Sequence, residues 1–94
     1  MKFADLKFKN TTMPDGIQSI VHYGDYELSI VKNEMSYGNA QGKYEIAVFN
    51  DVDQVELPGI TEEGDTVKGW LTEEDVSGIM IKMHSFTGKE PVQG

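Results

Sequence analysis

Hydrophobic and polar residues alternate most clearly over Ile17–Val31, where two segments flank the dipeptide Gly24-Asp25. Alternation with a period of two is typical of a β-strand with one buried face, and a two-residue turn containing glycine is typical of a β-hairpin. Such a turn fixes which residues stand opposite each other. The pattern predicts three pairs on an apolar face and two on the opposite face: Tyr23 with Tyr26, Val21 with Leu28, Ser19 with Ile30, and then His22 with Glu27 and Ile20 with Ser29.

Four more segments are candidates for strands. Lys43–Phe49 carries apolar side chains on both faces, which favours a central position in the sheet. Gln54–Leu57 is expected as a short strand that ends at Pro58-Gly59, because proline cannot continue a ladder. Thr66–Leu71 is a possible fifth strand. The opening segment Lys2–Lys9 is irregular, and we favour an edge strand over a loose arm.

The periodicity becomes helical after Thr72. Thr72 is a favourable N-cap residue, and with Asp75 three positions later it approximates a capping box. These signals predict a helix over Glu73–His84. Its apolar stripe, which can lie on the sheet, consists of Val76, Ile79, Met80 and Met83.

Together these elements predict an α+β fold, an antiparallel β-meander of four to five strands with one C-terminal helix packed on one face. A chain of 94 residues has room for one domain, which we place at residues 1–88, with a flexible tail at Lys89–Gly94. The predicted core contains Ile17, Val21, Leu28, Ile30, Tyr44, Ile46, Val48, Leu71, Val76, Ile79, Met80 and Met83.

Composition narrows the classes of function. Sixteen acidic residues against eight lysines, with no arginine, give a net charge of −8. This balance argues against direct binding of nucleic acid or of an anionic membrane. Without cysteine there is no disulfide, thiolate nucleophile or cysteine-ligated zinc. No run of residues is typical of a signal peptide or a membrane span, so we expect a cytoplasmic protein.

The negative charge is concentrated in residues 51–75, which hold nine acids and one lysine. Turn chemistry and the helix dipole account for the acids at both ends of this window. Four acids remain unexplained: Glu56, Glu62, Glu63 and Asp65. They predict a surface that binds a protein partner with a basic surface and can imitate nucleic-acid phosphates. Simple solvation of a small domain is the alternative.

The connection Asn33–Gly42 is longer than the two to five residues that are usual for a hairpin loop. We expect Met35 and Tyr37 to be exposed on it, and both residue types are enriched at protein interfaces. These two residues are therefore added to the predicted partner-binding site. The alternative is that both side chains fold back over one end of the core.

The two histidines each have a structural explanation. His22 is expected to pair across the hairpin with Glu27, and His84 lies near the predicted helix C-terminus, where a cation is favoured. The pair Asp51 and Asp53 matches a calcium loop poorly, because the following ligand positions are wrong. We predict no catalytic residue, no metal site and no cofactor.

Four segments carry a resemblance to a known group of proteins: Tyr26–Val31, Ser36–Gly38, Tyr44–Val48 and Gly69–Val76. Their order and spacing resemble small, acidic, uncharacterised proteins encoded by tailed bacteriophages and prophages, over about residues 14 to 84. The segment Pro58–Gly64 departs from the shorter connection expected there, so the acidic surface lies outside the resemblance. The resemblance implies a compact protein of the host cytoplasm that blocks host enzymes, defence complexes or DNA-binding proteins.

These observations favour a non-enzymatic phage-type protein that binds, and modulates or inhibits, a host or phage protein through its acidic surface. A structural or housekeeping subunit is an alternative within the binding functions. From another class, a small hydrolase or lyase would use His22 together with carboxylates.

Overall fold

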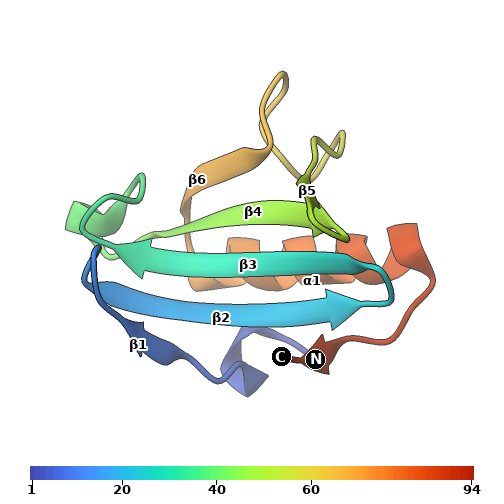
Figure 1. Cartoon of the computed structure of the whole chain (residues 1–94), viewed down its shortest axis with the longest axis horizontal. Helices are drawn as coiled ribbons and strands as arrows, with labels where there is room; N and C mark the ends of the chain where they lie inside the picture. Colours follow the sequence, from blue (N-terminus) through green and yellow to red (C-terminus); the bar gives the residue numbers. More distant parts are fainter.

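A seven-stranded antiparallel sheet with one α-helix behind it forms the protein, and the computed structural model describes residues 1–94 (Figure 1). Strands β1 to β5 follow one another across the sheet, while β6 pairs with β4 and β7 pairs with β2. The predicted α+β class, antiparallel sheet and single C-terminal helix are confirmed. In chain order the elements are the 3₁₀ helix η1 (Phe3–Asp5), β1 (Lys9–Thr11), β2 (Gly16–Tyr23), β3 (Tyr26–Asn33), the 3₁₀ helix η2 (Asn39–Gln41), β4 (Tyr44–Asn50), β5 (Asp53–Gln54), β6 (Val67–Leu71), α1 (Glu73–Thr87) and β7 (Val92–Gln93).

The β2–β3 hairpin has the predicted register. All five predicted pairs are present, from Ser19 with Ile30 to Tyr23 with Tyr26 at the turn. Gly24 occupies the turn with a φ of 65°, a conformation that glycine adopts without steric cost. The predicted apolar face packs against α1 in the core. No helix covers the opposite face of the sheet (Figure 1).

Helix α1 begins at the predicted capping box. The Thr72 side chain accepts from the Asp75 N–H at 3.0 Å, and the Asp75 carboxylate accepts from the Thr72 N–H at 3.0 Å. The helix continues three residues beyond His84, to Thr87, and ends at Gly88, whose N–H donates to the His84 carbonyl. None of the helices has the length and apolar character that crossing a lipid bilayer requires.

The hydrophobic core lies between the sheet and α1. Eleven of the twelve predicted core residues are buried, and Ile17 is half-buried at the margin of the cluster. Tyr23, Leu57 and Ile60 are additional buried members outside the predicted core, although the hairpin pattern placed Tyr23 on the apolar face.

The N-terminal segment differs from the expected strand over Lys2–Lys9. Phe3–Asp5 forms η1, and only Lys9–Thr11 pairs with β2. The rings of Phe3 and Phe8 both pack against Tyr44, at centroid distances of 5.1 and 5.8 Å. Both rings contact the same partner, which a regular strand would not allow. The segment therefore wraps over the end of the core.

The expected strand over Gln54–Leu57 is also mostly wrong, since β5 is Asp53–Gln54 and backbone hydrogen bonding to β4 ends with the Val55 N–H, which donates to the Val48 carbonyl at 2.9 Å. Leu57 instead starts a tight turn. Its N–H donates to the Thr61 hydroxyl at 2.9 Å, and its carbonyl accepts from the backbone N–H groups of Ile60 and Thr61. The turn buries Leu57 and Ile60 together, which a strand continuing past Gln54 could not do.

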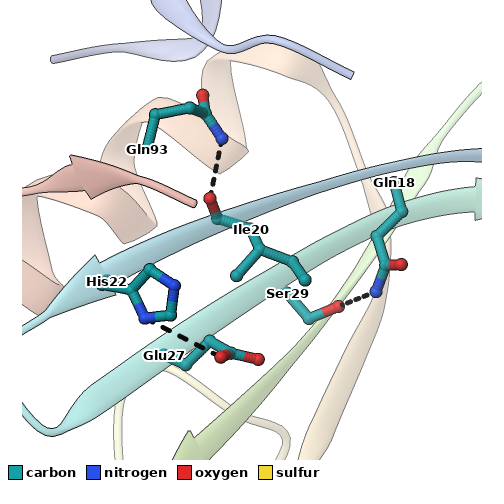
Figure 2. A network of polar contacts seen from close by, with 6 residues as sticks. All are labelled: Gln18, Ile20, His22, Glu27, Ser29 and Gln93. Carbon is teal, nitrogen blue, oxygen red and sulfur yellow. Dashed lines mark hydrogen bonds and ion pairs between the residues drawn. The ribbon is translucent and has the colours of Figure 1, made fainter. Parts of the chain in front are cut away.

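The C-terminal segment differs from the expected free tail, because β7 pairs with β2. The side chain of Gln93 donates to the Ser19 hydroxyl at 3.0 Å and to the Ile20 carbonyl at 2.7 Å. Its amide oxygen accepts from the Lys7 N–H at 3.0 Å. Figure 2 shows Gln93 above β2, where it fastens the chain end to the edge of the sheet.

Candidate functional site

The loop between β3 and β4 lies directly against β6. The Trp70 N–H donates to the Tyr37 carbonyl at 3.3 Å. Glycines make this approach feasible: a Cβ on Gly69 would lie 2.5 Å from the Tyr37 Cβ, and one on Gly38 would lie 3.1 Å from the Trp70 Cα. Two segments more than 30 residues apart can thus approach closely because Gly38 and Gly69 have no Cβ where one would clash with the other segment.

Trp70 lies where the pairing of β6 with β4 is irregular. The register shifts between Tyr44 and Ile46, and Trp70 has a φ of 61°, an uncommon conformation for a bulky residue. Two adjacent apolar residues at this point have opposite environments. Leu71 is buried in the core, whereas Trp70 is 54% exposed.

One pocket, which we call the loop pocket, lies on the side of Trp70 that faces the β3–β4 loop. It has a volume of about 340 Å³. Its walls come from the β3–β4 loop, the chain before β6 and β6 itself, and consist of Tyr37, Glu62, Asp65, Val67, Lys68, Gly69 and Trp70. The structure therefore brings together three predicted site residues, since Tyr37 lies beside Glu62 and Asp65, which follow it by 25 residues or more in the sequence.

A second pocket, which we call the helix pocket, lies between β6 and the first turns of α1. It has a volume of about 490 Å³ and shares Lys68, Gly69 and Trp70 with the loop pocket. Its other lining residues are Leu71, Glu74, Asp75, Gly78, Ile79 and Lys82. Trp70 thus forms a wall of both pockets and is the most central exposed side chain of the site.

The chain before β6 is held in place by its own polar groups. The Glu62 N–H donates to the Val67 carbonyl, and the Glu56 carboxylate accepts from the Gly64 N–H at 2.7 Å. The Lys82 ammonium donates to the Gly59 carbonyl at 2.9 Å, which ties this chain to α1. The acidic residues are therefore displayed on an ordered segment, seen above β4 in Figure 1.

No lysine forms an ion pair with the acids of residues 51–75. The structure has one ion pair, between His22 and Glu27, and none within this window. Two hydrogen bonds from Thr72, one of them from its backbone N–H, lower the pKa of Asp75, so this group stays ionised into acidic conditions. With nine acids and one lysine, residues 51–75 carry a net negative charge.

Three predicted site residues lie outside the loop pocket. Glu56 has a structural role in holding Gly64, and Glu63 is exposed but does not line the pocket. Met35 is 78% exposed on the β3–β4 loop and also lies outside it. The alternative that Met35 and Tyr37 fold back over the core is wrong, because Tyr37 is 62% exposed as well.

Trp70 is the site residue that sequence reasoning missed. The pair Trp70-Leu71 ends a predicted strand, and successive strand residues point to opposite faces. If Leu71 is in the core, Trp70 must point away from it. Strand alternation is therefore the sequence signal that identifies Trp70 as an exposed residue.

His22 lies on the uncovered face of the sheet, as Figure 2 shows. Its Nδ1 is 3.8 Å from Oε1 of Glu27, and its side chain is 46% exposed. His84 contacts the Lys89 carbonyl through Nδ1 at 2.9 Å, near the end of α1. The hydrolase or lyase alternative, which uses His22 together with carboxylates, stays a prediction. No group of three or more potential metal ligands converges in the structure.

Comparisons of the chain with models of protein families, with curated proteins and with solved structures find no match. The resemblance to phage proteins therefore stays a prediction.

Proposed function

We propose that this chain is a non-enzymatic binding protein that engages a basic surface of a partner protein. The observation that carries the proposal is the loop pocket, in which Tyr37 and Trp70 stand beside the carboxylates of Glu62 and Asp65. Exposed aromatic residues supply much of the binding energy at protein interfaces, and unpaired surface charge accelerates the encounter. Both contributions come from one face of the molecule.

The resemblance to small acidic phage proteins extends this proposal. A host protein or a phage protein is the natural partner in that setting, and modulation or inhibition follows if the occupied surface is one the partner needs. This extension rests on the resemblance alone, whereas the basic character of the partner rests on the geometry and charge of the pocket.

The proposal is tested by the kinetics of binding to a partner captured from a bacterial lysate. The variant Glu62→Lys, Glu63→Lys, Asp65→Lys should slow association by about tenfold or more at roughly 50 mM NaCl, because it removes the attraction that steers the encounter. A matched control with the same net charge replaces three exposed acids elsewhere: Asp15→Lys, Asp25→Lys and Glu90→Lys. Its association should slow much less.

Variants of the exposed loop distinguish electrostatic steering of the encounter from the contacts that hold the complex together. Met35→Ala with Tyr37→Ala should accelerate dissociation and leave association nearly unchanged, since these side chains act after the encounter. Surface plasmon resonance at two ionic strengths measures both rates. Kinetics that are indifferent to salt and to the lysine replacements would contradict the proposed function and leave the acids as solvation.

A further inference from the structure

The loop pocket combines two features that attract the same chemical group. Its aromatic walls, Tyr37 and Trp70, come from different segments, and each is more than half exposed. Its carboxylates, Glu62 and Asp65, outnumber the single lining cation, Lys68. Aromatic faces and carboxylates both favour a cation, and a planar cation that donates several hydrogen bonds uses both at once.

We propose that the loop pocket binds an arginine side chain of the partner, an inference that rests on the proposed function. The guanidinium group is planar, stacks on aromatic rings, and donates paired hydrogen bonds to carboxylates. A lysine ammonium meets the same charge but lacks the planar stacking and is more strongly hydrated. The volume of about 340 Å³ is at the low end for ligand sites, which suits one long side chain.

Glu62 is the carboxylate most available to an incoming guanidinium. No hydrogen bond or ion pair joins its side chain to the rest of the chain, while its backbone N–H is fixed to Val67 at 2.9 Å. Asp65 already has one carboxylate oxygen occupied, by the Thr66 N–H at 2.7 Å. Glu63 carries the same charge one position further on but does not line the pocket. Comparing variants of Glu62 and Glu63 therefore distinguishes binding in the pocket from general attraction by the surface.

The chain has a single tryptophan, so fluorescence emission reports on this pocket directly. The probes are hexaarginine amide and hexalysine amide, titrated at roughly 50 mM NaCl. Hexaarginine should change the Trp70 emission saturably, with a dissociation constant about threefold or more below that for hexalysine. Isothermal titration calorimetry measures the same binding independently of the indole.

Two variants with equal changes of charge provide the decisive comparison. Glu62→Gln should weaken hexaarginine binding by about tenfold, because a charge-assisted hydrogen bond is lost. Glu63→Gln should weaken it by less than about twofold, as expected for a screened surface charge. Circular dichroism confirms that both variants are folded.

Equal losses in Glu62→Gln and Glu63→Gln would overturn the arginine pocket and leave the acidic surface as a binding face. Calorimetric binding without a change in Trp70 emission, no binding of hexaarginine at all, or equal affinity for the two peptides would overturn it as well. Failure of the proposed function is recognised separately, by partner kinetics that ignore salt and the lysine replacements at Glu62, Glu63 and Asp65.

Discussion

Tyr23 is the most unusual side chain of the core. It is 1% exposed, and its hydroxyl has no hydrogen-bond partner. Burial raises its pKa to about 12, because the phenolate loses more solvation than the phenol. The ring fills the space between the end of β2 and α1. Burying its hydroxyl without a hydrogen bond costs free energy of folding.

Replacing Tyr23 with phenylalanine should stabilise the protein by about 1 kcal/mol near pH 8, because an unpaired buried hydroxyl is removed. The wild type should also lose stability as pH rises. Above pH 10 the unfolded chain releases a proton that the folded Tyr23 retains until about pH 12, which costs about 1 kcal/mol by pH 11.

Urea unfolding of both proteins at pH 8 and pH 11 checks this prediction. Tyr44, whose pKa is raised by burial and then by Glu73, remains in both proteins and contributes equally. A Tyr23→Phe variant with the same alkaline loss as the wild type would show that the Tyr23 hydroxyl does not carry it.

At the level of elements, Gly69 and Gly78 differ in the space that is available for a side chain. Gly69 lies in β6 with the Tyr37 Cβ and carbonyl in the space that a methyl group would take. Gly78 lies in α1 with nothing within 4 Å of the corresponding position. One glycine is required by the contact between β6 and the β3–β4 loop, and the other only weakens a helix.

Gly69→Ala should therefore destabilise the protein by about 1 to 3 kcal/mol and shift the Trp70 emission, because Tyr37 must move away. Gly78→Ala is the matched control and should stabilise it by about 0.5 to 1 kcal/mol. Urea denaturation measures both effects. A Gly69→Ala variant as stable as the wild type would mean that the loop does not need its close approach to β6.

The elements that could be predicted are those with local causes. The β2–β3 register follows from alternation and a two-residue turn, and α1 begins where Thr72 and Asp75 cap each other. η1 and β7 could not be predicted in this way. Their positions depend on Tyr44 and on β2, which are distant in sequence, and short irregular segments carry no periodic signal of such partners.

At the scale of the whole molecule, negative charge gathers at one end. The chain between β4 and β6, which carries most of the acids of residues 51–75, lies above the sheet in Figure 1, away from both termini. A net charge of −8 repels itself in the folded state, and salt screens that repulsion.

Salt should therefore raise the melting temperature of the wild type more than that of the variant with lysine at positions 62, 63 and 65, whose net charge is −2. Scanning calorimetry at roughly 20 and 300 mM NaCl measures the difference. The control with lysine at positions 15, 25 and 90 has the same net charge, so a smaller salt effect in the first variant than in this control reports clustering. Identical salt effects in all three proteins would contradict this account.

The site itself was predictable in parts. Tyr37, Glu62 and Asp65 were identified one by one from loop length and from charge without a structural role. Their convergence on Trp70 depends on how β6 pairs with β4 and on the glycines at the contact. Neither is a local property of the chain. Individual site residues could therefore be predicted from the sequence, whereas their arrangement in a pocket depends on the fold.

The first and last strands share one edge of β2, and this has a consequence for how the protein is made. β1 covers the start of that edge. β7, which follows the end of β2 by about 70 residues, covers its end. At ribosomal rates of 5 to 20 residues per second, this half of the edge is exposed for roughly 4 to 14 s during synthesis. An unpaired strand edge is a template for association with other chains, so the nascent protein is most vulnerable to aggregation before β7 emerges.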